Sequence, residues 1–132
     1  MIVVDASAVI EYLLKSPVGA KLAGRIGAPA ETLHATHLLD LEVAHVLRRF
    51  VLAGELAETR GREALADFAA LPLTRYPHAP FLRRIWSVRS SLTAYDAAYV
   101  VLAEALEAPL LTADKKLSRA HGHTARVELI DA

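Results

Sequence analysis

The chain of 132 residues contains no cysteine, so disulfide bonds, thiolate zinc sites and cysteine nucleophiles are all excluded. The lack of cysteine also fits a reducing compartment, and we expect a cytoplasmic protein. Net charge is lacking too, because 15 Lys and Arg balance 15 Asp and Glu. Any contact with nucleic acid must therefore come from a local basic patch, since the molecule has no overall positive field.

Long apolar segments are also missing. No apolar run approaches the ~20 residues of a membrane span. Residues 1–5 enter a strand-like run at once, without the basic and apolar segments of a signal peptide. We therefore expect neither a membrane span nor a secretion signal. Hydrophobic residues nevertheless make up 54% of the chain, which allows a sizeable core, and the length predicts a single domain over residues 1–132.

Short apolar runs alternate with helical patterns along the sequence. Strands are expected at residues 2–4, 33–35, 73–76, 109–112 and 126–130. Helices are expected at residues 7–15, 17–26, 38–53, 57–70, 79–89 and 94–106, with a helical turn or two at 115–120. This alternation predicts an α/β fold in which a central, mostly parallel sheet is covered by helices on both faces.

Four acidic residues stand in apolar surroundings, where a charge is unfavourable unless something compensates it. They are Asp5, Glu42, Asp96 and Asp114. Asp5 and Asp114 follow strand-like runs, and ligands of open α/β sheets gather beyond the carboxyl ends of the strands, so we expect these two in one crevice. Glu42 and Asp96 lie in helical patterns rich in Leu, Val and Ala. Because Mg²⁺ and Mn²⁺ prefer carboxylate and water ligands, the set predicts metal-assisted hydrolysis.

Each acid also has an ordinary structural explanation. Asp5 and Asp114 could cap the helices that follow them. Asp96 could answer the dipole of its helix after an N-cap at Thr93. Glu42 could be a solvated residue at the border of an apolar helix face. The joint arrangement favours a metal site, because caps need not share a crevice.

Other phosphate or hydrolase chemistry fits the sequence less well. The chain has no Gly-x-x-x-x-Gly-Lys-Ser/Thr loop, no Gly-x-Gly-x-x-Gly and no Gly-x-Ser-x-Gly. A phosphatase of the α/β type needs Asp-x-Asp after its first strand, whereas this chain has Asp5-Ala6-Ser7. A receiver domain needs adjacent acids near the first strand, which are also absent.

Four stretches together resemble the PIN-domain ribonucleases, specifically the VapC-type toxins of toxin–antitoxin pairs. They are residues 2–8 (IVVDASA), 38–44 (LLDLEVA), 92–99 (LTAYDAAY) and 110–114 (LLTAD), in the family's order and spacing. The resemblance implies a three-layer α/β/α sandwich and a Mg²⁺- or Mn²⁺-dependent endoribonuclease that cleaves RNA through metal-activated water. It also implies a homodimer and a small cognate antitoxin whose C-terminal tail enters the acidic groove.

The resemblance assigns roles to individual residues. The family's catalytic and metal-binding acids correspond to Asp5, Glu42, Asp96 and Asp114. Its small hydroxyl residue near the first acid corresponds to Ser7, and its Thr before the last acid to Thr112. Lys115 and Lys116 follow a candidate metal ligand directly, which suits contact with the phosphate backbone of RNA.

This sequence departs from the family pattern at one place. Some members carry a further acid two or three residues past the fourth, where this chain has Lys116 and Leu117, so a second metal would bind weakly or only with substrate. Asp40 is an extra acid, and helical spacing turns it away from Glu42. The alternative is a non-catalytic PIN-like binding module that acts through dimerisation and antitoxin contact. The presence of all four acids argues against it. Candidate dimer faces lie on the helices at 38–53 and 57–70.

Overall fold

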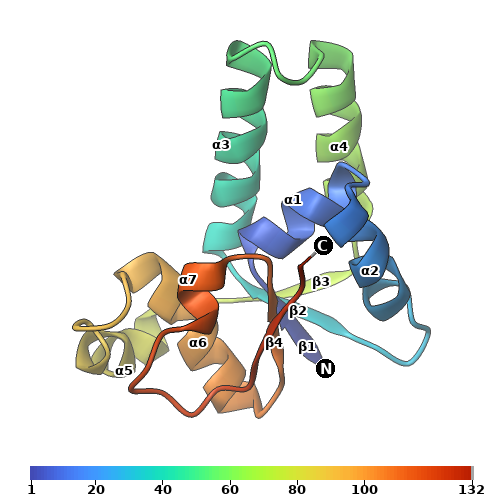
Figure 1. The fold of residues 1–132 in the computed structure, drawn as a ribbon. Helices are drawn as coiled ribbons and strands as arrows, with labels where there is room; N and C mark the ends of the chain where they lie inside the picture. The colour runs from blue at the N-terminus through green and yellow to red at the C-terminus, as the bar shows by residue number, and fades with distance from the viewer. Residues whose placement is uncertain (132) are drawn as a thin grey trace.

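The computed structural model describes residues 1–131, in which five strands form one sheet with helices on both sides (Figure 1). The strands are β1 (Ile2–Val4), β2 (Leu33–Thr36), β3 (Leu73–Tyr76), β4 (Leu110–Thr112) and β5 (Val127–Leu129). Their order is β3-β2-β1-β4-β5, and every described pairing is parallel. The sheet expected to be mostly parallel is therefore parallel throughout the described chain.

The helices agree closely with the periodicity of the sequence. They are α1 (Ala6–Leu13), α2 (Pro17–Ile26), α3 (Leu38–Leu52), α4 (Glu58–Ala70), η1 (Ala79–Phe81), α5 (Leu82–Ser87), α6 (Ala94–Leu106) and α7 (Lys115–Ser118). The single helix expected at 79–89 is wrong in detail. It is a 3₁₀ turn followed by a short α-helix, because Pro80 has no amide N–H and fits only a first turn. None of the helices within residues 1–131 is long and apolar enough to cross a membrane.

The topology places helices on both faces of the sheet. Parallel strands are joined by right-handed crossovers. The chain moves outward from β1 to β2 and β3 through α1 to α4, so these helices share one face. It then crosses back to β4 and β5 through α5, α6 and α7, which cover the other face. Figure 1 shows this three-layer arrangement, with α3 and α4 projecting as an antiparallel hairpin.

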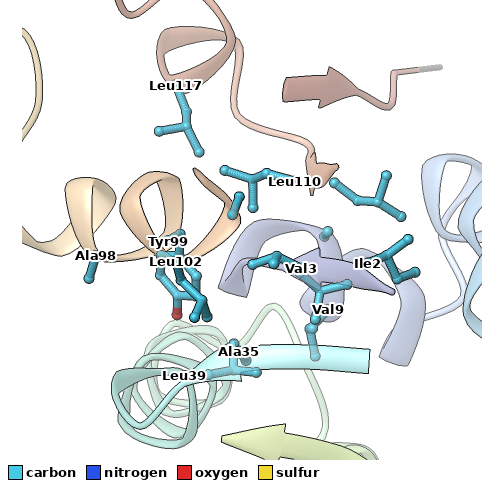
Figure 2. Packing of buried hydrophobic residues seen from close by; sticks show 14 of the residues in the cluster. Ile2, Val3, Val9, Ala35, Leu39, Ala98, Tyr99, Leu102, Leu110 and Leu117 are labelled. Carbon is cyan, nitrogen blue, oxygen red and sulfur yellow. The ribbon is translucent and has the colours of Figure 1, made fainter. Parts of the chain in front are cut away.

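The core lies where β1 and β4 meet helices from both layers. All residues of these two strands are buried. Figure 2 shows Val3 and Leu110 of the strands beside Leu102 of α6 and Leu39 of α3. The direction of the connections reverses between β1 and β4, and in open α/β sheets the crevice beyond such a reversal is the usual ligand site.

An ion pair between Arg84 of α5 and Glu104 of α6 lies beside the loop that leads to β5. Arg84 donates from Nε to Oε1 of Glu104 at 3.0 Å and from Nη2 to Oε2 at 2.8 Å. The amide and hydroxyl of Thr124 also donate to Oε2. The hydrogen bonds from Arg84, followed by those from Thr124, lower the pKa of Glu104 to about 2.

Replacing Glu104 by Gln is expected to lower the free energy of unfolding by about 1–3 kcal/mol at pH 7, the usual size for hydrogen bonds to a charged group. The folded-state pKa is depressed, so this stability is present above the unfolded value of about 4.3 and is lost as the pH falls toward 2. Urea unfolding at pH 7 and pH 3 should therefore show a smaller difference at pH 3. Glu58→Gln is the matched control, because the Glu58–Arg62 pair is exposed and should contribute little. Equal effects of the two variants would contradict this expectation.

Candidate active site

Asp5 is the acid most deeply built into the fold. It follows β1 directly and caps α1, because its Oδ1 accepts a hydrogen bond from the amide of Ala8 at 2.9 Å. The same oxygen accepts from the Ser7 hydroxyl at 2.7 Å, and Oδ2 accepts from the Thr112 hydroxyl at 2.5 Å. The explanation of Asp5 as a helix cap is thus confirmed, but the cap does not use all of the hydrogen-bond acceptor positions of the carboxylate. A carboxylate offers about four acceptor positions, so these three donors leave one free.

Ser7 and Thr112 form a bracket around Asp5 from two segments far apart in sequence. Each hydroxyl gives its single proton to Asp5 and accepts an amide proton, Ser7 from Ala113 at 2.9 Å and Thr112 from Asp114 at 3.0 Å. Because both protons are committed, the 3.2 Å contact between the two hydroxyls adds no further hydrogen bond. The bracket fixes the carboxylate of Asp5 and links the end of β1 to the end of β4.

Glu42 comes from the α3 layer and has one partner. The phenol of Tyr99, on α6, donates a hydrogen bond of 2.5 Å to its Oε1. Burial raises the pKa of Glu42; the hydrogen bond from Tyr99 opposes the rise, and the charges of Asp5 and Asp96 add to it. The solvated-border explanation is therefore wrong, because Glu42 is partly buried and held from behind by a core side chain.

Asp96 lies in the first turn of α6 and is not the N-cap of this helix, which is Thr93. Thr93 accepts the hydrogen bond from the Asp96 amide at 3.2 Å, as the sequence predicts. The hydroxyl of Thr93 also lies close enough to the carboxylate of Asp96 to lower its pKa in part. Burial, and then the negative charge of Asp114, raise the pKa of Asp96. A carboxylate whose main role was to answer the helix dipole would have its pKa lowered.

Asp114 caps the last helix, as one explanation from the sequence required. Its Oδ1 accepts from the amide of Lys116 at 2.8 Å, and α7 begins at Lys115. The two lysines are exposed, and the charge of Lys116 reaches Asp96, whose pKa it lowers in part. The lysines therefore flank the acids on the solvent side.

The four acids influence one another through their charges, although they come from four separate segments. Burial is the main cause of the raised pKa of Asp5, Glu42 and Asp96. The charge of Asp114 adds to the rise for Asp5 and Asp96, and the charges of Asp5 and Asp96 add to it for Glu42. The structure thus brings the four predicted residues to one end of the sheet. Within residues 1–131, however, no three His, Asp or Glu side chains lie close enough to hold a metal ion by themselves.

The chemistry of this cluster fits a hard divalent cation. Its donors are carboxylate oxygens, and burial together with mutual repulsion raises the pKa of Asp5, Glu42 and Asp96. A cation would relieve that repulsion. Mg²⁺ commonly binds through only one or two carboxylates and keeps several waters, so a site of this kind does not need three converging side chains.

A groove runs along α3 and reaches Glu42. It has a volume of about 840 Å³ and begins at Ala6 and Glu42. Arg48, Arg49 and the exposed Tyr95 also line it. The described structure pairs neither arginine with an acid, so the groove joins an acidic end to a basic wall.

Three features of the site were not predicted from the sequence. Tyr99 entered only as part of the stretch 92–99 that resembles the family, and Thr36, buried at the end of β2, was not singled out. Asp40 was left without a role; it faces away from Glu42, as helical spacing predicts, and pairs with Arg75 of β3 at 2.8 Å. The position of Tyr99 three residues after Asp96 was the available signal, since both lie on one face of α6.

Comparison with known proteins places this geometry in a family. Residues 2–122 match the PIN domain. This chain belongs to the PIN domain family. It is 42% identical over 130 residues to Ribonuclease VapC12 of Mycobacterium tuberculosis, which covers 98% of this chain and 99% of that protein. It is 47% identical over 118 residues to Ribonuclease VapC9 of the same organism, covering 89% of each.

The architecture recurs in solved structures of the family. The crystal structure of VapBC2 from Rickettsia felis, bound to a DNA fragment from the promoter, contains a chain that superposes with a TM-score of 0.70. The match covers 99% of this chain and 100% of that chain at 16% sequence identity. At this identity the likeness supports the fold alone, and it agrees with the three-layer α/β/α arrangement expected from the sequence.

Proposed function

We propose that this PIN-domain protein is an endoribonuclease and the toxin of a toxin–antitoxin pair. The observation that carries the proposal is that four carboxylates lie at the switch point of the sheet, where burial, and then the charges of neighbouring acids, raise the pKa of Asp5, Glu42 and Asp96. The names of the relatives support the same activity, because those proteins are VapC ribonucleases of nearly equal length.

The residues of the cluster divide into fixed and free groups. The bracket of Ser7 and Thr112 holds Asp5 in place. Asp96 offers a carboxylate that forms no ion pair within residues 1–131, and Glu42 reaches the cluster from α3. Lys115 and Lys116 stand beside the acids, where they could contact the phosphate backbone of RNA. The basic wall of the groove provides a second place for the RNA strand.

We propose that Asp5, Asp96 and Asp114 hold Mg²⁺ or Mn²⁺ in part through bound water, with Glu42 as a further ligand or as the group that orients the attacking water. When bound, such an ion lowers the pKa of a water molecule and offsets negative charge on the scissile phosphate. The chain's own contribution is to orient the carboxylates of Asp5 and Glu42 through hydrogen bonds, which also oppose the rise in pKa that burial causes.

The test is incubation of the purified protein with total bacterial RNA and Mg²⁺, followed by mapping of new 5′ ends. Cleavage at defined internal positions is expected, and a cognate antitoxin added beforehand should suppress it. RNA that remains intact under every condition would contradict the nuclease and favour a non-catalytic binding module. Progressive shortening from the ends, without internal cuts, would contradict an endonuclease.

Two further properties belong to this proposal. We propose a VapB-like antitoxin partner whose C-terminal tail enters the acidic groove, because an arginine can pair with a carboxylate through two parallel hydrogen bonds. We also propose a homodimer that acts in the cytoplasm, where its RNA is. Exposed apolar side chains on the candidate faces support self-association, namely Leu41 and Leu52 on α3 and Leu65 on α4.

A further inference from the structure

We propose that Tyr99 is a positioning residue for catalysis, which acts by holding the Glu42 carboxylate in its productive orientation. The inference rests on the proposed nuclease function and extends it to a residue that does not touch RNA. It links two elements, α3 and α6, that supply two of the four acids from opposite sides of the sheet.

Tyr99 is placed by packing and not by the acids. Its side chain is 1% exposed and belongs to the core beside Leu102 and Leu39. Figure 2 shows its phenol oxygen directed from α6 toward α3. A buried ring has little freedom to move, so the 2.5 Å hydrogen bond to Oε1 fixes one oxygen of Glu42 and leaves the other available.

Without this bond Glu42 would have several orientations open to it. A Glu side chain has three rotatable bonds, and no other described group donates a hydrogen bond to the Glu42 carboxylate. Burial and the Glu42 carboxylate raise the pKa of Tyr99, so the phenol keeps its proton and remains a donor over the whole working pH range.

Thr36, at the end of β2, lies near the phenol. Its hydroxyl is buried and forms no hydrogen bond of good geometry within residues 1–131. It lies close enough to the phenol to lower the pKa of Tyr99 in part. The phenol oxygen donates to Glu42 and still has lone pairs for this neighbour. Thr36, Tyr99 and Glu42 therefore follow one another from the end of β2 to the acid cluster.

The test is a double-mutant cycle between Tyr99→Phe and Glu42→Gln. Tyr99→Phe keeps the buried ring, and we expect kcat for RNA cleavage to fall about 10–100-fold, as for loss of a group that orients a metal ligand. The KM for RNA should change little, because the phenol does not contact solvent. In the Glu42→Gln background the same change should alter kcat less than about twofold, because the residue it acts through is already impaired.

A second readout does not depend on activity. The Mn²⁺ concentration that gives half of the thermal stabilisation should rise about tenfold or more in Tyr99→Phe. In the double variant this concentration should be no higher than in Glu42→Gln alone. Thr36→Val should shift kcat in the same direction by a smaller factor. Tyr76→Phe is the control: it removes a phenol hydroxyl bonded to His34 at 2.8 Å and should leave kcat and the Mn²⁺ response unchanged.

A Tyr99→Phe variant with the kcat and the Mn²⁺ response of the wild type would overturn the inference. So would a double variant whose loss of kcat equals the product of the losses in the two single variants. Both results would reduce Tyr99 to a core residue. A wild-type protein that cuts no RNA would instead overturn the nuclease proposal, so the two failures can be told apart.

Discussion

Asp96→Asn is expected to abolish RNA cleavage while leaving the metal-free protein at least as stable as the wild type. Asn keeps a carbonyl oxygen that can accept a hydrogen bond from the neighbouring Thr93 hydroxyl, so the substitution removes the charge and retains the local acceptor. The loss of activity should exceed the roughly 10–100-fold that follows removal of a group behind a metal ligand. Cleavage rates under saturating RNA and urea unfolding in chelator measure the two halves of this expectation.

The expected effect of Asp96→Asn on the stability of the metal-free protein depends on pH. The folded-state pKa of Asp96 is raised, so its contribution to stability is fully present below the unfolded value of about 3.9 and is lost as the pH rises through the folded value. The advantage of Asp96→Asn in chelator should therefore be largest near pH 7 and should vanish toward pH 4. Asp40→Asn is the matched control: it removes an acid that pairs with Arg75 outside the cluster, so activity should persist. Loss of activity in both variants would contradict a specific role for Asp96.

Removal of divalent metal is expected to stop cleavage completely and reversibly. The chain has no cysteine, and the site offers carboxylates as its main reactive groups. Mg²⁺ or Mn²⁺ should restore the rate after chelation, whereas Ca²⁺ should support it poorly, because its looser coordination positions a water less well. Circular dichroism in chelator should show that the fold persists. Robust cleavage in excess chelator would contradict a metal-dependent mechanism.

Local patterns in the sequence were enough to predict most of the fold. The apolar runs at 2–4 and 109–112 are typical of buried strands, and the structure has buried strands at 2–4 and 110–112. The parallel sheet follows from the alternation of such runs with helices. The rule that ligands gather beyond the carboxyl ends of the strands predicted that Asp5 and Asp114 share one crevice. That their strands are neighbours is known only from the structure. The helix expected at 79–89 was too long. Hydrophobic periodicity does not show that the segment with Pro80 forms a separate 3₁₀ turn before a short α-helix.

Contacts between distant segments could not be predicted in this way. Glu42 and Tyr99 are 57 residues apart, and their pairing depends on how α3 and α6 pack across the sheet. The partner of Asp40 is likewise set by the register of β3 beside β2. Ser7 and Thr112 entered only through resemblance to the family, whereas their hydrogen bonds to Asp5 give a physical reason for their presence.

The most direct test of one shared metal site is thermal melting of the wild type and Asp96→Asn, each in chelator and in Mn²⁺. If the acids converge on a cation, Mn²⁺ should raise the melting temperature of the wild type strongly and that of Asp96→Asn much less, since a ligand stabilises only through its affinity for the folded state. In chelator Asp96→Asn should melt at the same temperature as the wild type or higher. Equal responses to Mn²⁺, with a lower melting temperature for Asp96→Asn in chelator, would contradict this account and reduce Asp96 to a residue that stabilises its own helix.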